Sequence, residues 1–211
     1  MRILVAALAL SAAVATPIVA QQMQMPGSKS VAAITGGTYA VDPNHSFVIW
    51  EVNHFGFSPL SGMFGEITGT LQLDPKNVAA TKVDVTIPIS KLAVASEGFR
   101  GHLLRPGKDG GKPDFFGASP ADAKFVSTSV VATDDDEAKM TGNLTINGIT
   151  KPVTLEVDFY GAGTMPAAMG GKENVGFEAE GKIKRSDFGL GMAVPLVSDE
   201  VELKIAAAFQ K

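Results

Sequence analysis

Val175-Gly-Phe-Glu-Ala-Glu-Gly-Lys-Ile-Lys-Arg-Ser-Asp187 is the stretch of sequence that decides the fold. Every second residue from Val175 to Ile183 is apolar or small, whereas the residues between them are charged from Glu178 to Lys184. Side chains of a β-strand alternate between two faces, so this pattern predicts a strand with one buried and one solvated face. Continuing the count places Arg185 and Asp187 on the buried face, where a charge needs a partner or a ligand.

The same alternation recurs through the chain and predicts an antiparallel sheet with one wet face. The alternating segments are 83–89, 153–159 and 201–205, and further strands are expected at 46–54, 62–73, 125–132 and 139–146. Asn147-Gly148 lies between two such segments and favours a two-residue hairpin, because both positions need positive φ. About eight strands joined mostly by hairpins predict an all-β protein that closes into a barrel.

A barrel of this size is either filled by side chains or holds one small ligand. Gly65, Gly69, Gly142 and Gly181 fall on the apolar face and thin it. They indicate a cavity or, alternatively, sharp bends and close packing, and the residues alone favour close packing.

Residues 90–120 interrupt the alternation for longer than a hairpin loop. Apolar side chains at both ends of this segment, among them Leu103 and Phe115, predict a short helix or a lid. Arg105 to Pro113 is rich in Gly, Lys and Pro and is expected to form an exposed excursion.

The N-terminus has the pattern of a secretory signal peptide, with Arg2, an apolar run over Ile3–Val14, Pro17 and Ala20. We expect cleavage after Ala20, a flexible leader over 21–37, a single domain over 38–211, and no transmembrane segment in the mature chain. Loss of Arg2 would leave 17 basic and 22 acidic residues, a net charge of −5 that does not suit nucleic acid. The chain has no cysteine, which excludes a disulfide framework and a lipoprotein anchor.

Catalytic and metal-binding patterns are weak. His45 and His54 are nine residues apart, which puts them on opposite faces of an uninterrupted strand, and no metal-binding motif is present. Ser46 lacks the glycine-flanked turn of a hydrolase nucleophile. We therefore predict neither a metal site nor catalytic residues, and no cofactor.

For Trp50 and for the charged residues Arg185 and Asp187, the sequence alone allows two interpretations each. Trp50 shares a face with Val48, Val52 and His54, and either plugs a barrel end or belongs to a strand whose outside is covered. Arg185 and Asp187 either form an ion pair or meet a ligand together with Arg100 and His102. An arginine suits an anionic or carbonyl headgroup because its planar fork offers several fixed donors.

Several segments, taken in order, resemble the YceI-like periplasmic proteins, and together they cover nearly all of residues 38–209. The matching segments are Tyr39-Ala-Val-Asp-Pro-Asn-His-Ser46, Val52-Asn-His54, Gly62-Met-Phe-Gly65 with Gly69, Arg100-Gly-His-Leu103, Phe115-Phe116, Gly142-Asn-Leu-Thr-Ile-Asn-Gly-Ile-Thr-Lys-Pro-Val153 and Arg185-Ser-Asp-Phe-Gly189. This chain departs from the family pattern in the longer link between Leu103 and Phe115 and in Asp122, where a proline is common.

The resemblance implies an extended, eight-stranded, lipocalin-like barrel that holds a polyisoprenoid or another long amphiphile in the periplasm and has no established catalytic activity. It makes a cavity the favoured interpretation; a filled structural or interaction domain is the alternative, and an enzyme acting on a lipid is the least favoured. The partner would be a small amphiphilic lipid such as a quinone or polyprenyl compound, and a homodimer stays open. Side chains expected along the lipid tail are Trp50, Phe64, Ile67, Phe99, Leu103, Phe115, Phe116, Leu144, Phe177 and Ile183. A polar mouth is expected from His54, Arg100, His102, Arg185 and Asp187.

Overall fold

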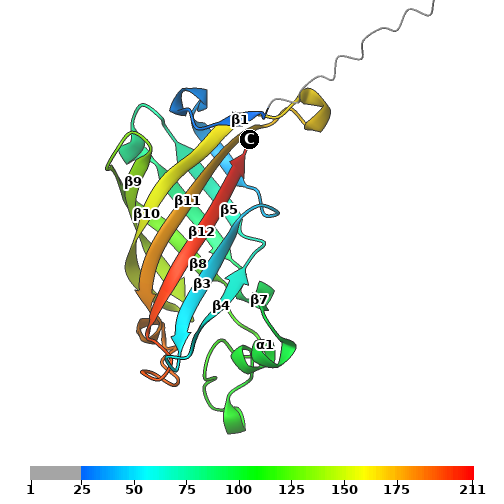
Figure 1. Ribbon diagram of the computed structural model, residues 1–211, viewed down its shortest axis with the longest axis vertical. Coiled ribbons are helices and arrows are strands. Elements are labelled where there is room, and N and C mark those ends of the chain that lie inside the picture. Colours follow the sequence, from blue (N-terminus) through cyan, green and yellow to red (C-terminus); the bar gives the residue numbers. More distant parts are fainter. Residues whose placement is uncertain (1–24) are drawn as a thin grey trace, which may run out of the picture.

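A computed structural model describes residues 25–211 and shows an elongated antiparallel β-barrel (Figure 1). The predicted signal peptide, its cleavage site and residues 21–24 lie outside the described residues. Eight strands close the barrel because β10 and β12 both pair with β11. In ring order these strands are β2 (Gly37–Val41), β5 (Thr68–Leu73), β6 (Lys82–Ile87), β8 (Ala123–Ala132), β9 (Glu137–Ile146), β10 (Ile149–Thr164), β11 (Glu173–Lys184) and β12 (Glu200–Gln210).

Four further strands extend this ring: β1 (Gly27–Ser28), β3 (Phe47–His54), β4 (Ser58–Phe64) and β7 (Leu92–Val94). β12 has a different neighbour in each half, because Phe209 and Gln210 pair with β2 whereas 202–206 pair with β3. β4 and β7 then continue the wall from β3. We call the end that carries β1 and the C-terminus the upper end, and the opposite end the lower end (Figure 1).

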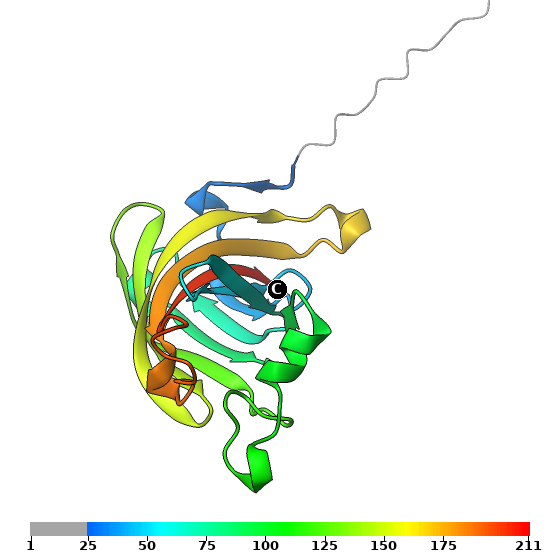
Figure 2. The same cartoon turned by 60° about the horizontal axis from the view of Figure 1, so that its bottom comes forward.

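The short connections are α1 (Glu97–Leu103) and six 3-10 turns among the described residues. The turns are η1 (Val31–Ala33), η2 (Val78–Ala80), η3 (Ile89–Lys91), η4 (Lys108–Gly110), η5 (Ala167–Met169) and η6 (Arg185–Phe188). Figure 2 brings the lower end forward and shows α1 (green) on one side of it and the β11–β12 connection (orange) on the other.

The alternation that predicted the strands is confirmed in β11. Val175 and Ala179 are buried, while Glu178, Glu180 and Lys182 are exposed. The expected hairpin at Asn147-Gly148 is also present, with φ of 51° and 74°. The sheet register therefore follows from the apolar pattern, since a shift of one residue would expose every buried side chain.

Two expected boundaries differ in the structure. The strand expected over 62–73 is divided into β4 and β5, because Glu66 adopts a φ of 54° and turns the chain. The expected leader is partly ordered: Gly27 and Ser28 pair with β10, and Thr35 donates hydrogen bonds to Glu173. In the second case the sequence carries no alternation that would reveal the contact.

The interior is packed in two apolar clusters. The cluster toward the upper end includes Tyr39, Leu71, Phe159, Val175 and Phe209. The second cluster runs along β8, β9, β10 and β11 to η6, where Phe188 is almost fully buried. The packing leaves two cavities, one bordered by both clusters and one bordered by residues 90–120, and these form the candidate site.

Candidate functional site

A large apolar cavity occupies the lower half of the barrel, with a volume of about 500 Å³. That volume is within the range of about 300–1,000 Å³ typical of small-molecule sites. Eight of the ten predicted tail residues line it. They are Trp50, Phe64, Phe99, Leu103, Phe115, Phe116, Leu144 and Ile183.

A second, smaller cavity of about 180 Å³ lies above the first. The two predicted tail residues missing from the lower cavity, Ile67 and Phe177, line this upper one. Ile87, Leu144 and Leu203 line both cavities, so the two spaces adjoin. Both cavities are lined almost entirely by apolar side chains.

Residues 90–120, which we call the lid segment, cover one side of the lower cavity. Phe116 on this segment meets Phe64 of β4 with ring centroids 6.0 Å apart and planes at 89°. Within the segment, His102 contacts Phe115 edge to face at 5.3 Å, and the Phe116 amide donates to the Leu103 carbonyl. The helix expected here is therefore present and presents aromatic side chains to the cavity.

Arg100 holds α1 against the first residues of the lid segment, next to β7, which pairs with β4 of the barrel wall. Its Nε donates to the Leu92 carbonyl at 3.1 Å and its Nη2 to the Ser90 carbonyl at 3.0 Å. Arg100 is not among the residues that line either cavity. The structure therefore places this predicted mouth residue in the lid attachment.

Arg185 is buried, with 6% of its surface exposed, and lines the lower cavity. Its guanidinium donates to four backbone carbonyls of the β11–β12 connection, those of Leu190, Met192, Val197 and Ser198. Burial lowers the pKa of Arg185, and the nearby Asp199 carboxylate opposes that change. The arginine thus organises the loop that bounds the cavity, and four of its five N–H donors are occupied.

Asp187 does not pair with Arg185. β11 ends at Lys184, and the chain turns into η6, so Asp187 points to solvent. Asp199 has the structural role instead, accepting hydrogen bonds from the Ser186 amide at 2.8 Å and hydroxyl at 2.7 Å. Burial alone would raise the pKa of Asp199, but these hydrogen bonds and Arg185 hold it below its usual value. The placement of Asp187 on the inner face was wrong, because the alternation ends with the strand.

Three of the polar side chains that line the lower cavity belong to residues at the lower end of the barrel, whereas Trp50 lies higher on the wall, opposite Leu203. His54, His102 and Arg185 line this cavity, and the buried Nε1 of Trp50 has no hydrogen-bond partner within residues 25–211. Reasoning from sequence named the two histidines and Arg185 but not Met192, Ala193 or Val197, which also line the cavity. A loop without alternation gave no signal for them.

The interior glycines make room for neighbouring side chains. A Cβ on Gly142 would lie 2.3 Å from Phe125 Cζ, and one on Gly181 would lie 2.6 Å from Leu155 Cδ2. At Gly69 the obstacle is the Asp84 carbonyl, whereas Gly65 has nothing within 4 Å. The close-packing interpretation therefore holds at three of the four glycines, and the cavity arises elsewhere.

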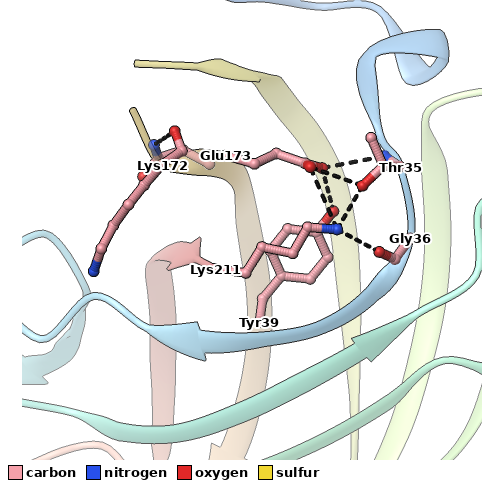
Figure 3. A network of polar contacts seen from close by, with 7 residues as sticks. Thr35, Gly36, Tyr39, Lys172, Glu173 and Lys211 are labelled. Atoms are coloured by element: carbon pink, nitrogen blue, oxygen red, sulfur yellow. Dashed lines mark hydrogen bonds and ion pairs between the residues drawn. The ribbon is translucent and has the colours of Figure 1, made fainter. Parts of the chain in front are cut away.

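A polar network, which we call the latch, lies at the upper end (Figure 3). Glu173 accepts hydrogen bonds from Tyr39 Oη at 2.5 Å and Thr35 Oγ1 at 2.7 Å, and its carboxylate lies 3.3 Å from Lys211 Nζ. Lys211 also donates to the Gly36 carbonyl. Burial alone would raise the pKa of Glu173, but the bonds from Tyr39, Thr35 and Lys211 lower it to about 2. The latch joins the leader, β2, β11 and the chain end above the apolar core.

Within residues 25–211, no three His, Asp or Glu side chains gather in a way that could hold a metal ion. Ser46, considered above as a nucleophile, instead bridges the backbone of Ala208, donating to its carbonyl and accepting from its amide. None of the helices in this part of the chain has the length and apolar character needed to cross a membrane.

The closed ring of eight antiparallel strands around an apolar cavity places the protein in the class of lipocalin-like barrels. The YceI-like domain family matches residues 39–209, and the chain belongs to this family. It is 41% identical to protein YceI of Escherichia coli O157:H7 over 180 residues, covering 84% of this chain and 88% of that protein. Protein YceI of Salmonella arizonae is 42% identical over 171 residues, covering 80% of this chain and 84% of that protein.

Solved structures show the same fold. BcnA of Burkholderia cenocepacia superposes with a TM-score of 0.65 at 25% identity, covering 80% of this chain and 98% of that chain. The YceI protein of Campylobacter jejuni gives a TM-score of 0.61 at 32% identity, covering 74% and 86% respectively. A domain of Saccharophagus degradans described as polyisoprenoid-binding gives 0.51 at 10% identity, covering 81% and 97%, which supports the fold alone.

Proposed function

We propose that this protein binds a polyisoprenoid or a related long amphiphile, such as a quinone or polyprenyl compound, and carries or sequesters it in the periplasm. The observation that carries the proposal is the pair of adjoining apolar cavities, of which the lower one is also lined by His54, His102 and Arg185. Burying an apolar tail there would supply most of the affinity, at about 25 cal/mol per Å² before the costs of association.

The arrangement favours one orientation of the ligand. The upper cavity is apolar except for Ser46 and Thr81, whereas His54, His102 and Arg185 line the lower one. A tail would therefore lie toward the upper end and a headgroup near the two histidines, because an unpartnered polar group in the upper cavity would be costly. A cavity of about 500 Å³ favours a binding barrel over a filled structural one.

Family membership and the N-terminal pattern support a binding protein that is exported. The Saccharophagus degradans domain, described as polyisoprenoid-binding, illustrates that the shared fold accommodates such ligands. Binding needs no nucleophile and no cofactor, which suits a cavity whose lining is apolar apart from a few polar groups.

The single tryptophan gives a direct test, because Trp50 lines the lower cavity. Titration with ubiquinone should quench Trp50 fluorescence saturably, and native mass spectrometry should show one lipid per chain. Absence of both signals, together with no lipid in organic extracts of the protein from its own host, would contradict the proposal.

A variant at the junction tests whether the tail enters both cavities. Leu203 lines both, so Leu203→Phe should weaken binding of long polyprenols more than that of short ones. Lys204→Phe is the matched control, because Lys204 faces solvent on the same strand. Equal affinity of the Leu203→Phe variant for all chain lengths would show that the tail does not pass the junction.

A further inference from the structure

Two loops at the lower end expose large apolar side chains side by side. Phe55 and Phe57 belong to the β3–β4 turn, and Met192, Val194 and Leu196 belong to the β11–β12 connection. We call these five residues the apolar rim. Phe57 is 90% exposed and Leu196 is 62% exposed.

Backbone contacts hold the two loops together. The Phe55 amide donates to the Leu196 carbonyl at 2.9 Å, the Ser198 amide donates to the Asn53 carbonyl at 3.0 Å, and His54 forms an isolated β-bridge with Val197. Phe55 has a φ of 55°, a conformation that is costly for a bulky residue. The backbones that carry the exposed side chains are therefore joined to each other by defined contacts.

The rim is continuous with the lower cavity. Phe55 and Met192 belong to both, because they line the cavity and are also exposed to solvent. Phe57, Val194 and Leu196 lie only on the outside. An apolar ligand leaving the cavity on this side would meet the rim before it met open water.

The groove beside Phe57 is lined by negative charges. A polar groove of about 550 Å³ borders Phe57 and contains Glu51, Glu200 and Glu202, and no Lys or Arg is among its lining residues. Lys182 lies beside this groove and pairs with both Glu200 and Glu202. This balance does not attract an anionic surface.

We propose that the apolar rim docks on a lipid surface of low net charge, so that the ligand passes between a bilayer and the cavity at the lower end; the transfer step rests on the proposed function. Five side chains on two loop tips are too few for a stable protein interface, which buries about 1,200 Å² or more in total. They suffice to enter the boundary of a bilayer, where aromatic and aliphatic side chains partition.

The test is sedimentation with sucrose-loaded phosphatidylcholine vesicles. It uses the chain as purified from the producing cell, with its N-terminus defined by mass spectrometry. In a variant carrying Phe57→Ser and Leu196→Ser, the affinity for these vesicles should fall by about tenfold or more. Neither residue lines the cavity, so uptake of a detergent-delivered polyprenol should not change.

A variant carrying Val131→Ser and Tyr160→Ser is the matched control, since both residues are well exposed away from the rim. It should bind vesicles like the unmodified chain. Replacing part of the phosphatidylcholine by phosphatidylglycerol should not strengthen binding at low salt.

Three outcomes would overturn the docking proposal: equal binding by the rim variant and the unmodified chain, stronger binding to phosphatidylglycerol, or self-association that the rim substitutions abolish without any vesicle binding. Failure of the cavity to take up polyprenol while rim-dependent sedimentation persists would support docking and contradict only the proposed function.

Discussion

The indole ring of Trp50 on β3 meets the ring of Phe99 on α1 edge to face, with centroids 6.3 Å apart and planes at 61°. This contact joins the barrel wall to the lid segment across the lower cavity. Both rings also line the cavity, so Trp50 fluorescence should respond both to a bound ligand and to the position of the lid segment.

Phe99→Ala should loosen the lid without unfolding the barrel. An aromatic pair contributes about 0.5–1.5 kcal/mol beyond the area that it buries. We expect ubiquinone to dissociate roughly tenfold faster in stopped-flow measurements of Trp50 fluorescence. Phe99→Leu is the control that keeps apolar bulk and should retain most of the slow release. An unchanged dissociation rate in Phe99→Ala would show that the lid does not govern release.

Gly142→Ala should destabilise the barrel, because its new Cβ would lie 2.3 Å from the Phe125 ring. Overpacking of this kind costs about 1–3 kcal/mol in the free energy of unfolding. Gly65→Ala is the matched control, with nothing within 4 Å, and should change that free energy by less than about 0.5 kcal/mol. Urea denaturation of both variants measures the difference, and equal stabilities would refute the close-packing interpretation.

The latch makes stability depend on acid. The pKa of Glu173 is lowered from 4.5 to about 2 in the folded protein, so its contribution is complete above pH 4.5 and is lost as the pH falls toward 2. Glu173→Gln should reduce stability at neutral pH by about 1–3 kcal/mol and flatten the acid side of the profile. Thermal melts between pH 2 and pH 7 test this, with the exposed Glu156→Gln as control. If the stability of Glu173→Gln falls with pH in parallel with that of the unmodified chain, the latch is not the source of the acid dependence.

Arg185→Met should leave four buried or half-buried carbonyls without their donor. We expect a loss of about 2–4 kcal/mol in unfolding free energy and faster proteolysis within residues 189–199. Because most of its donors are occupied by the backbone, Arg185→Met should weaken binding of ubiquinone and of a headgroup-free polyprenyl chain equally. A selective loss for ubiquinone would instead assign Arg185 a direct contact with the headgroup.

The histidines are better placed for that contact. His54 and His102 line the lower cavity, so His102→Phe should weaken ubiquinone binding more than binding of the headgroup-free chain. The expected selective loss is about fivefold to tenfold, the value of one hydrogen bond. Parallel titrations followed by Trp50 fluorescence measure it, and equal losses would argue that His102 acts only by packing on Phe115.

Sequence periodicity predicted the barrel wall well because burial imposes it residue by residue. β11 shows this most clearly, since its exposed Glu178 and Glu180 alternate with the inward Phe177 and buried Ala179. The predicted tail residues on strands line the cavities for the same reason, whereas Phe99, Leu103, Phe115 and Phe116 were expected there from the family resemblance.

Prediction failed where the chain leaves regular structure. Asp187 was counted as inward because the alternation was extended beyond Lys184, where η6 rotates the chain. Asp199, which binds Ser186, lies thirteen residues further on and has no periodic relation to it. The carbonyl partners of Arg185 and Arg100 could not be predicted either, because backbone acceptors have no sequence signature.

The closed upper end determines how such a barrel would exchange its contents. Tyr39 is fully buried, its hydroxyl donates to Glu173 of the latch, and its ring packs in the upper cluster, so side chains fill the barrel at this end. A long molecule that enters tail first must leave head first, by reversing along the same path. The site that delivers the ligand and the site that receives it would then both have to meet the lower end of the barrel. The protein would have to turn or move from one site to the other.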